Sequence, residues 1–150
     1  MLRAVSVRPA GQWDESAAAD CVTLESSERF RRRIALTGED GLPFLLDLAE
    51  ATFLHDGDGL VLDDGRIVRV AGRREPLIEI AARSASELAR LAWHIGNRHI
   101  DVQIVNGRLR MRRDHVIESM LSSLGARMTP ISAVFEPEPG AYADSHDDAA

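Results

Sequence analysis

In the first half of the chain, short apolar runs alternate with turn-forming dipeptides. Asp58-Gly59 and Asp64-Gly65 separate such runs, and residues 60–62 and 67–70 flank the second dipeptide as the arms of a hairpin would. Aspartate and glycine suit these positions because they tolerate the positive φ angles of a tight loop. The pattern predicts a small all-β domain over residues 1–73.

After Pro76 the spacing of the apolar residues changes to that of a helix. Residues 77–80 have the composition of a strand, and Ser84 with Glu87 three residues later has the capping-box spacing that starts a helix. The next apolar residues recur at i, i+3, i+4 and i+7 and are Leu88, Leu91, Ala92 and Ile95. We expect this stripe to pack on a sheet and Gly96 to end the helix.

A hairpin, a second helix and a last strand complete the pattern. Asn106-Gly107 lies between two apolar runs and is the strongest short-range hairpin signal in the chain. Asp114 can cap a helix that Gly125 ends, and residues 128–135 form a final apolar run. The order β-α-β-β-α-β predicts a ferredoxin-like domain over residues 74–140 and an α+β fold class for the whole chain.

Acidic residues are concentrated at the end of the chain. The net charge is −6, and residues 136–150 hold no basic residue but carry Glu136, Glu138, Asp144, Asp147 and Asp148. The remainder is nearly neutral, which argues against a nucleic-acid partner. We expect residues 141–150 to be an acidic, flexible tail.

Cys21 is the only cysteine, so one chain can build neither an internal disulfide nor a thiolate metal cluster. The first apolar run is too short for a signal peptide, and no later run is long enough to span a bilayer. We expect a soluble cytoplasmic protein without a membrane partner.

Histidine is the residue type with the clearest candidate chemistry. The chain has His55, His94, His99, His115 and His146, and no pair has the His-x-x-x-His spacing that places two ligands on one helical face. No serine, histidine and carboxylate set has the spacing of a triad, and no phosphate-binding loop occurs. The sequence predicts no enzyme and no complete metal cage from one chain.

His99 allows two interpretations. A helix continued past Gly96 would return His99 to the apolar stripe as a hydrogen-bonded core residue, whereas a break at Gly96 would turn it outward as a metal ligand. His94 and His99 lie about 140° apart on a continuous helix, so they converge only if the backbone breaks between them. From the residues alone, His94 and His115 are ordinary surface histidines, and His146 belongs to the tail.

Two further charged patterns have structural explanations. The residues Asp56-Gly57-Asp58-Gly59 suggest calcium, but the EF-hand spacing is absent and turn formation suffices. Basic stripes over residues 28–33 and at Arg108, Arg110 and Arg112 are typical of solvated strand faces, and either could bind an acidic partner.

Three segments resemble UreE, the nickel metallochaperone family of urease accessory proteins. They are residues 93–99 (WHIGNRH), residues 114–116 (DHV) and residues 135–142 (FEPEPGAY), within a wider resemblance over residues 29–142. The resemblance implies a protein that binds Ni²⁺ and delivers it for assembly of the urease active site. It also implies a homodimer in which His99 shares one metal ion with the same residue of the second copy.

The resemblance implies secondary metal sites at His115, His94 and His146, with Zn²⁺ or Cu²⁺ able to substitute because imidazole accepts both. This chain departs from the family pattern at residues 109–115, where arginines stand in place of further histidines. Its tail also lacks a histidine-rich run, so high-capacity nickel storage is not expected.

The resemblance also implies partners. Residues 1–73 would form a peptide-binding domain that contacts the apo-urease complex, residues 74–140 would bind metal and dimerise, and the urease GTPase accessory protein would receive the nickel. One alternative is a protein-interaction module without a metal role. Another is a small hydrolase using His94, His99 and a carboxylate, which the absence of triad or zinc spacing disfavours.

Overall fold

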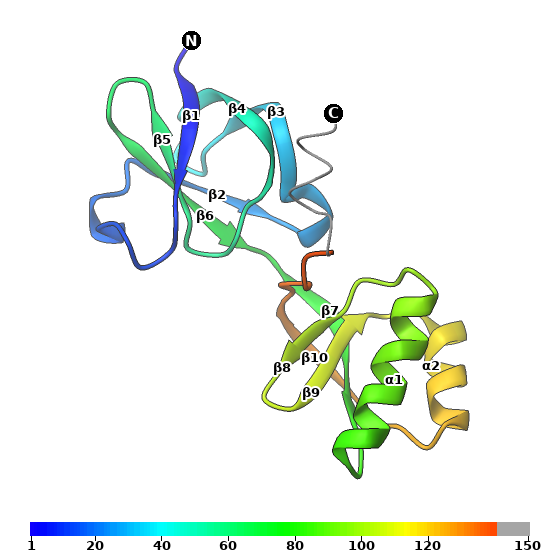
Figure 1. Ribbon diagram of the computed structural model, residues 1–150. Helices are drawn as coiled ribbons and strands as arrows, with labels where there is room; N and C mark the ends of the chain where they lie inside the picture. The colour runs from blue at the N-terminus through cyan, green and yellow to red at the C-terminus, as the bar shows by residue number, and fades with distance from the viewer. Residues whose placement is uncertain (141–150) are drawn as a thin grey trace. The chain divides into compact units, whose positions relative to one another are not determined.

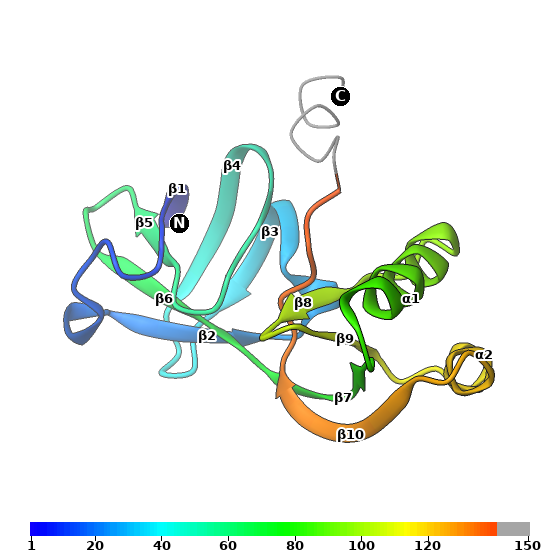
Figure 2. The same ribbon diagram turned by 60° about the horizontal axis from the view of Figure 1, so that its bottom comes forward.

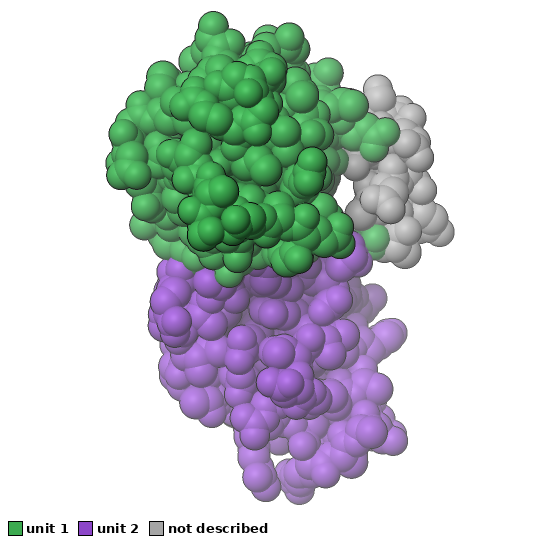
Figure 3. All heavy atoms as spheres, turned by 90° about the vertical axis from the view of Figure 1, so that its left-hand side faces the viewer, with its two compact units in different colours: residues 1–73, 140–150 green, residues 74–139 purple. Residues whose placement is uncertain are grey.

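The computed structural model describes residues 1–140, whose contacts fall into two units (Figure 3). Arg74–Pro139 form the C-terminal unit, and Met1–Arg73 make up the N-terminal unit. No helix within the described residues has the length and apolar character needed to cross a membrane.

The N-terminal unit is a single six-stranded sheet, as the all-β prediction required (Figure 1). Its strand order is β2-β6-β5-β1-β4-β3, and two short 3₁₀ turns lie in the connections. The elements are β1 (Arg3–Arg8), η1 (Glu15–Ala17), β2 (Asp20–Leu24), η2 (Ser26–Glu28), β3 (Phe30–Thr37), β4 (Pro43–Phe53), β5 (Gly59–Leu62) and β6 (Ile67–Gly72).

The predicted hairpin at Asp64-Gly65 is confirmed as the β5–β6 pair. Gly65 has φ +90°, and its N–H donates to the carbonyl oxygen of Leu62 at 2.9 Å. Buried apolar side chains from five strands, all but β3, form the core together with Leu54 just after β4, and β3 contributes partly buried residues. The buried members are Ala4, Val22, Leu24, Phe44, Leu46, Leu48, Leu54, Leu60, Leu62, Val68 and Val70.

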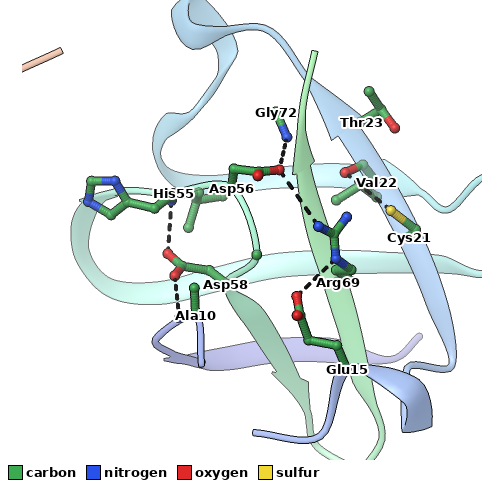
Figure 4. A network of polar contacts seen from close by, with 12 residues as sticks. Ala10, Glu15, Cys21, Val22, Thr23, His55, Asp56, Asp58, Arg69 and Gly72 are labelled. Carbon is green, nitrogen blue, oxygen red and sulfur yellow. Dashed lines mark hydrogen bonds and ion pairs between the residues drawn. The ribbon is translucent and has the colours of Figure 1, made fainter. Parts of the chain in front are cut away.

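The aspartates of residues 56–59 accept hydrogen bonds from backbone N–H groups, which agrees with their interpretation as turn residues (Figure 4). Asp58 is buried and accepts the N–H groups of Ala10 at 3.0 Å and His55 at 2.8 Å. Asp56 accepts the N–H of Gly72 at 2.8 Å and lies 3.8 Å from the guanidinium of Arg69.

The C-terminal unit has the predicted β-α-β-β-α-β order and the ferredoxin-like strand arrangement. Its antiparallel sheet has the order β10-β7-β9-β8, and both helices cover one face of it (Figure 2). The elements are β7 (Arg74–Ala81), α1 (Ala85–Asn97), β8 (Gln103–Val105), β9 (Arg108–Arg112), α2 (His115–Ser123) and β10 (Arg127–Val134). The α+β prediction is confirmed.

The core of the C-terminal unit lies between sheet and helices. The expected α1 stripe contributes Leu91 and Ile95, which pack with α2 residues Ile117 and Leu121. The strands supply the other buried members, Ile78, Ile80, Leu109 and Met111.

The predicted helix starts and the second hairpin are confirmed. Ser84 Oγ accepts the N–H of Glu87 at 3.1 Å, and Asp114 Oδ1 accepts two N–H groups at the start of α2. Asn106 and Gly107 have φ +51° and +71°, both positive as a type I′ hairpin turn requires.

The prediction that Gly96 ends α1 is wrong. Helix α1 continues through Gly96 to Asn97, and the left-handed residue that stops it is His99, with φ +57°. The physical reason lies in the apolar residues on either side. With the stop at His99, the partly buried Ile100 packs against the core cluster that contains Ile95, whereas a stop at Gly96 would bring the polar Asn97 to that position.

Candidate functional site

His99 occupies the left-handed position of a Schellman motif at the end of α1. Its N–H donates to the carbonyl oxygen of Gly96 at 3.0 Å, and the N–H of Ile100 donates to that of Ile95 at 3.3 Å. Together these bonds satisfy two carbonyl groups that the helix end would leave without partners. The apolar contact of Ile100 with the core that holds Ile95 completes the motif.

The left-handed backbone decides between the two interpretations of His99. The reversal of the chain sends Ile100 to the core and leaves His99 exposed, so the core-histidine alternative is wrong. A residue with a Cβ costs about 1–2 kcal/mol in this conformation relative to the right-handed one, and glycine is the usual occupant. Strain of this kind is often found at functional sites, where the fold holds a side chain in position.

His115 lies at the same end of the helical layer as His99. It is the first residue of α2, it is exposed, and the capping residue Asp114 precedes it. Because β7 and β9 are antiparallel and each leads into a helix, α1 ends where α2 begins (Figure 1). The topology therefore brings two histidines that are sixteen residues apart in sequence to one end of the C-terminal unit.

His94 is half-buried on α1 and contacts the neighbouring indole. The ring centroids of Trp93 and His94 lie 5.0 Å apart in an edge-to-face arrangement. Trp93 itself is 63% exposed, and Val116 in the first turn of α2 is 64% exposed. Sequence reasoning gave Trp93 no role of its own, although it stands off the stripe of residues 88, 91, 92 and 95 and should therefore face solvent. The apolar spacing of α2 instead predicts Val116 on the buried face with Ile117 and Leu121, and its exposure shows that this prediction is wrong.

The chain after β10 lies along the edge strand β8. The N–H of Glu138 donates to the carbonyl oxygen of Val102 at 2.8 Å, and the Glu138 carboxylate accepts the N–H of Ile104 at 3.0 Å. Val102 follows His99 by three residues, so Glu138 is bonded to the segment that directly follows the end of α1. His146 itself lies outside the described residues.

The arginines of β9 are held by carboxylates of the same unit. Arg108 and Arg110 both bind Glu79, at 2.8 and 3.0 Å, and Arg112 binds Asp101 at 3.0 Å. The hydrogen bond from Arg108, aided by Arg110, keeps the pKa of Glu79 below its usual range although partial burial opposes this. These arginines stabilise the sheet and, being always protonated, cannot bind a metal.

The described part of one chain contains no group of three or more histidine, cysteine or carboxylate side chains placed to hold a metal ion. The histidines of the C-terminal unit that the structure describes are the exposed His99 and His115 and the half-buried His94.

Comparison with known proteins assigns both units to one family. Residues 2–72 match the model of the N-terminal domain of the UreE urease accessory protein, and residues 75–150 match that of its C-terminal domain. This chain belongs to the UreE urease accessory protein family. The resemblance found in the sequence is thereby confirmed.

Curated relatives support the assignment over nearly the whole chain. A urease accessory protein UreE of Bradyrhizobium sp. (strain BTAi1 / ATCC BAA-1182) is 56% identical over 144 residues, which are 96% of this chain and 69% of the relative. One from Rhodopseudomonas palustris (strain BisB18) is 54% identical over 153 residues, covering 99% of this chain and 72% of the relative. One from Beijerinckia indica subsp. indica is 51% identical over 148 residues, which are 99% of this chain and 85% of the relative.

Family membership implies a role in urease maturation. The UreE family consists of accessory proteins and not of enzymes, in agreement with the absence of any catalytic signature in the sequence. The hydrolase alternative that used His94 and His99 is therefore set aside.

Proposed function

We propose that this protein is a nickel metallochaperone that binds Ni²⁺ through His99 at the interface of a homodimer and releases it for assembly of the urease active site. The observation that carries the proposal is the exposed imidazole of His99 on a strained helix end. A fold that tolerates this strain at an exposed position presents the side chain to something outside its own core.

The dimer follows from the number of ligands. One imidazole supplies one ligand, and a twofold axis through this end of the C-terminal unit would bring a second His99 to the same ion. Trp93 and Val116 give the surface around it the exposed apolar area that a pairing face needs. His115, His94 and His146 are the candidates for secondary sites.

An incomplete ligand shell suits delivery. Two imidazoles leave coordination positions for water or other side chains, so the ion can be exchanged instead of trapped. The same shell does not select nickel by affinity, because Cu²⁺ exceeds Ni²⁺ in the divalent series and Zn²⁺ also binds imidazole. Selection then depends on which ion is available and on the receiving partner.

The two units divide the work in this proposal. The C-terminal unit binds the ion and dimerises, and the N-terminal unit contacts the apo-urease complex. The receiving partner is the urease GTPase accessory protein, and the transfer takes place in the cytoplasm.

Nickel titration by calorimetry of the His99→Ala variant tests the proposal. We expect the wild-type protein to bind about one tight Ni²⁺ per dimer and the variant to lose this binding, with thermal unfolding nearly unchanged because His99 is exposed. His55→Ala, which removes a histidine of the N-terminal unit, is the matched control and should keep the tight site. Wild-type protein that binds less than one ion per dimer at micromolar concentration would favour a protein-interaction module without a metal role.

Sedimentation velocity tests the shared site separately. A metal held between two copies stabilises the dimer by mass action, so Ni²⁺ should lower the dissociation constant of the dimer relative to protein in chelator. This shift should disappear in His99→Ala. Equal dissociation constants with nickel and with chelator would contradict a site between the two copies.

A further inference from the structure

Strand β3 forms one edge of the six-stranded sheet and carries three consecutive exposed arginines, Arg31, Arg32 and Arg33. Within the described residues β3 pairs only with β4, so its other side presents backbone groups of the kind that a further strand can bind (Figure 1). We call this side, with Phe30 and the three arginines, the β3 edge.

Among residues 1–140, Arg31 and Arg32 form no close ion pair with a carboxylate, although Arg32 lies near enough to Asp47 to interact with its charge. Arg33 lies 3.7 Å from Asp47, which also binds Arg3. By contrast, Nε of Arg31 donates to the carbonyl oxygen of Glu28 at 3.4 Å, and Nε of Arg32 to that of Ala49 at 3.5 Å. The remaining guanidinium donors of Arg31 and Arg32 are available for an incoming anion, and carboxylates match their geometry.

An exposed aromatic residue lies beside this charge. Phe30 is 51% exposed and stands opposite Phe53 in the β3–β4 register, and the Arg29 guanidinium lies 5.0 Å from the Phe53 ring centroid. Aromatic residues next to arginines are enriched in the parts of protein interfaces that contribute most to binding.

A second copy of β3 would be a poor occupant of this edge. Antiparallel pairing of two such strands would place arginines opposite or diagonal to arginines, and like charges across strands are destabilising. The β3–β4 register also jumps between Arg31, opposite Thr52, and Arg33, opposite Asp47, and such irregularities are one way in which edges avoid self-pairing.

We propose that the β3 edge binds an extended acidic segment of a partner protein, which adds to the sheet as a strand beside β3. Backbone hydrogen bonds would supply the affinity, and carboxylates on Arg31 and Arg32 the specificity, while an apolar residue of the segment covers Phe30. This assigns a partner chemistry to the N-terminal unit and does not depend on the proposed binding of nickel.

Fluorescence anisotropy with nickel-free protein tests the proposal. The probe is a labelled peptide of eight residues, the length of β3, with two adjacent glutamates, one phenylalanine and valine elsewhere. The carboxylates of the two glutamates face opposite sides of an extended strand, as the side chains of Arg31 and Arg32 do. We expect saturable binding that weakens about tenfold or more when salt rises from about 0.05 to about 0.5 M. At low salt, a peptide with glutamine in place of glutamate should bind about tenfold more weakly than the glutamate peptide. Equal binding of the two peptides would overturn the proposal.

Matched variants locate the site. Arg31→Gln with Arg32→Gln should weaken binding about tenfold or more, whereas Arg8→Gln with Arg127→Gln removes the same charge from exposed positions elsewhere and should change it less than about twofold. Thermal unfolding of both double variants verifies that they fold. Equal loss in the two double variants would show non-specific charge attraction and overturn the assignment to β3.

Backbone pairing and the identity of the occupant have their own tests. In an added strand, alternate N–H groups of the peptide point towards β3. Two peptides, each methylated at one of the two alternating sets of nitrogens, should therefore differ: one should lose binding and the other should keep it. Binding by both would overturn the proposal.

Protein truncated after residue 140 should bind the probe as tightly as the full chain. Binding about tenfold tighter in the truncated form would show that the chain's own acidic end occupies the edge, against the proposal.

Discussion

Helices α1 and α2 end in the same backbone motif with different residues at its left-handed position. At the end of α2, Gly125 has φ +87°, its N–H donates to Ser122, and the next N–H donates to Leu121. At the end of α1, His99 stands in the equivalent place with φ +57°.

The difference separates what the fold needs from what the site needs. Glycine adopts the left-handed conformation without a Cβ penalty, so α2 ends at little conformational expense. The α1 end instead holds His99, a strained residue whose imidazole is exposed at the end of the helical layer. Replacing the left-handed residue of α1 by glycine should therefore raise the free energy of unfolding and remove the ligand. The left-handed residue of α2 is already glycine, so no such exchange exists there.

The largest expected effect comes from the apolar residue that anchors each motif. Ile95→Ala and Leu121→Ala each remove a fully buried side chain and should lower the free energy of unfolding by about 2–5 kcal/mol. Urea denaturation measures both. A loss below about 1 kcal/mol at Ile95 would show that the α1 end is not fixed by core packing, and the comparison would fail.

The next largest effect is expected at Gly125. Gly125→Ala places a Cβ at φ +87° and should lower the free energy of unfolding by about 1–2 kcal/mol. The added Cβ would lie 3.4 Å from Arg83 Nη2, an ordinary contact, so backbone strain is the main cause. Urea denaturation that shows no loss would contradict the assignment of Gly125 as the left-handed residue of α2.

Gly96→Ala should have the opposite sign. Gly96 lies inside α1 without a positive φ, and apart from its chain neighbours and the backbone of its own helix, a Cβ there meets no atom within 4 Å. Alanine should raise the free energy of unfolding by about 0.5–1 kcal/mol because glycine weakens a helix interior. A lower free energy of unfolding in this variant would support the original prediction that the helix ends at Gly96.

The smallest effect concerns pH and the start of α2. The hydrogen bond from Arg113 holds the pKa of Glu118 below its usual range, despite desolvation, with help from the N–H of Asp114. A lowered folded-state pKa contributes stability above the unfolded-state pKa, and this contribution is lost as pH falls towards the folded-state value. Glu118→Gln should therefore reduce the loss of stability between about pH 5 and about pH 3, by less than about 1 kcal/mol. Parallel pH profiles of wild type and variant would contradict this.

Local rules predicted the element order because the signals were strong and independent. Asn106-Gly107 fixed a hairpin, Ser84 and Asp114 fixed two helix starts, and the apolar stripe of α1 fixed its buried face. With the strands between them, these signals leave the ferredoxin-like arrangement as the simplest antiparallel sheet.

The end of α1 could not be found from glycine alone, because the motif is decided by the pair of apolar residues that it brings together. Ile95 and Ile100 have the five-residue separation that the motif requires, and this spacing was the available signal. The absence of a close carboxylate at Arg31 and Arg32 among residues 1–140 was beyond sequence reasoning, since the pairing of Arg33 with Asp47 depends on how β3 meets β4.

His99→Gly tests the central claim most directly, through nickel titration and urea denaturation of the same variant. Glycine relieves the left-handed strain and removes the imidazole, so we predict a gain of up to about 1 kcal/mol in the free energy of unfolding together with loss of the tight nickel site. A variant that keeps wild-type nickel affinity, or one that is destabilised by the change, would contradict the account.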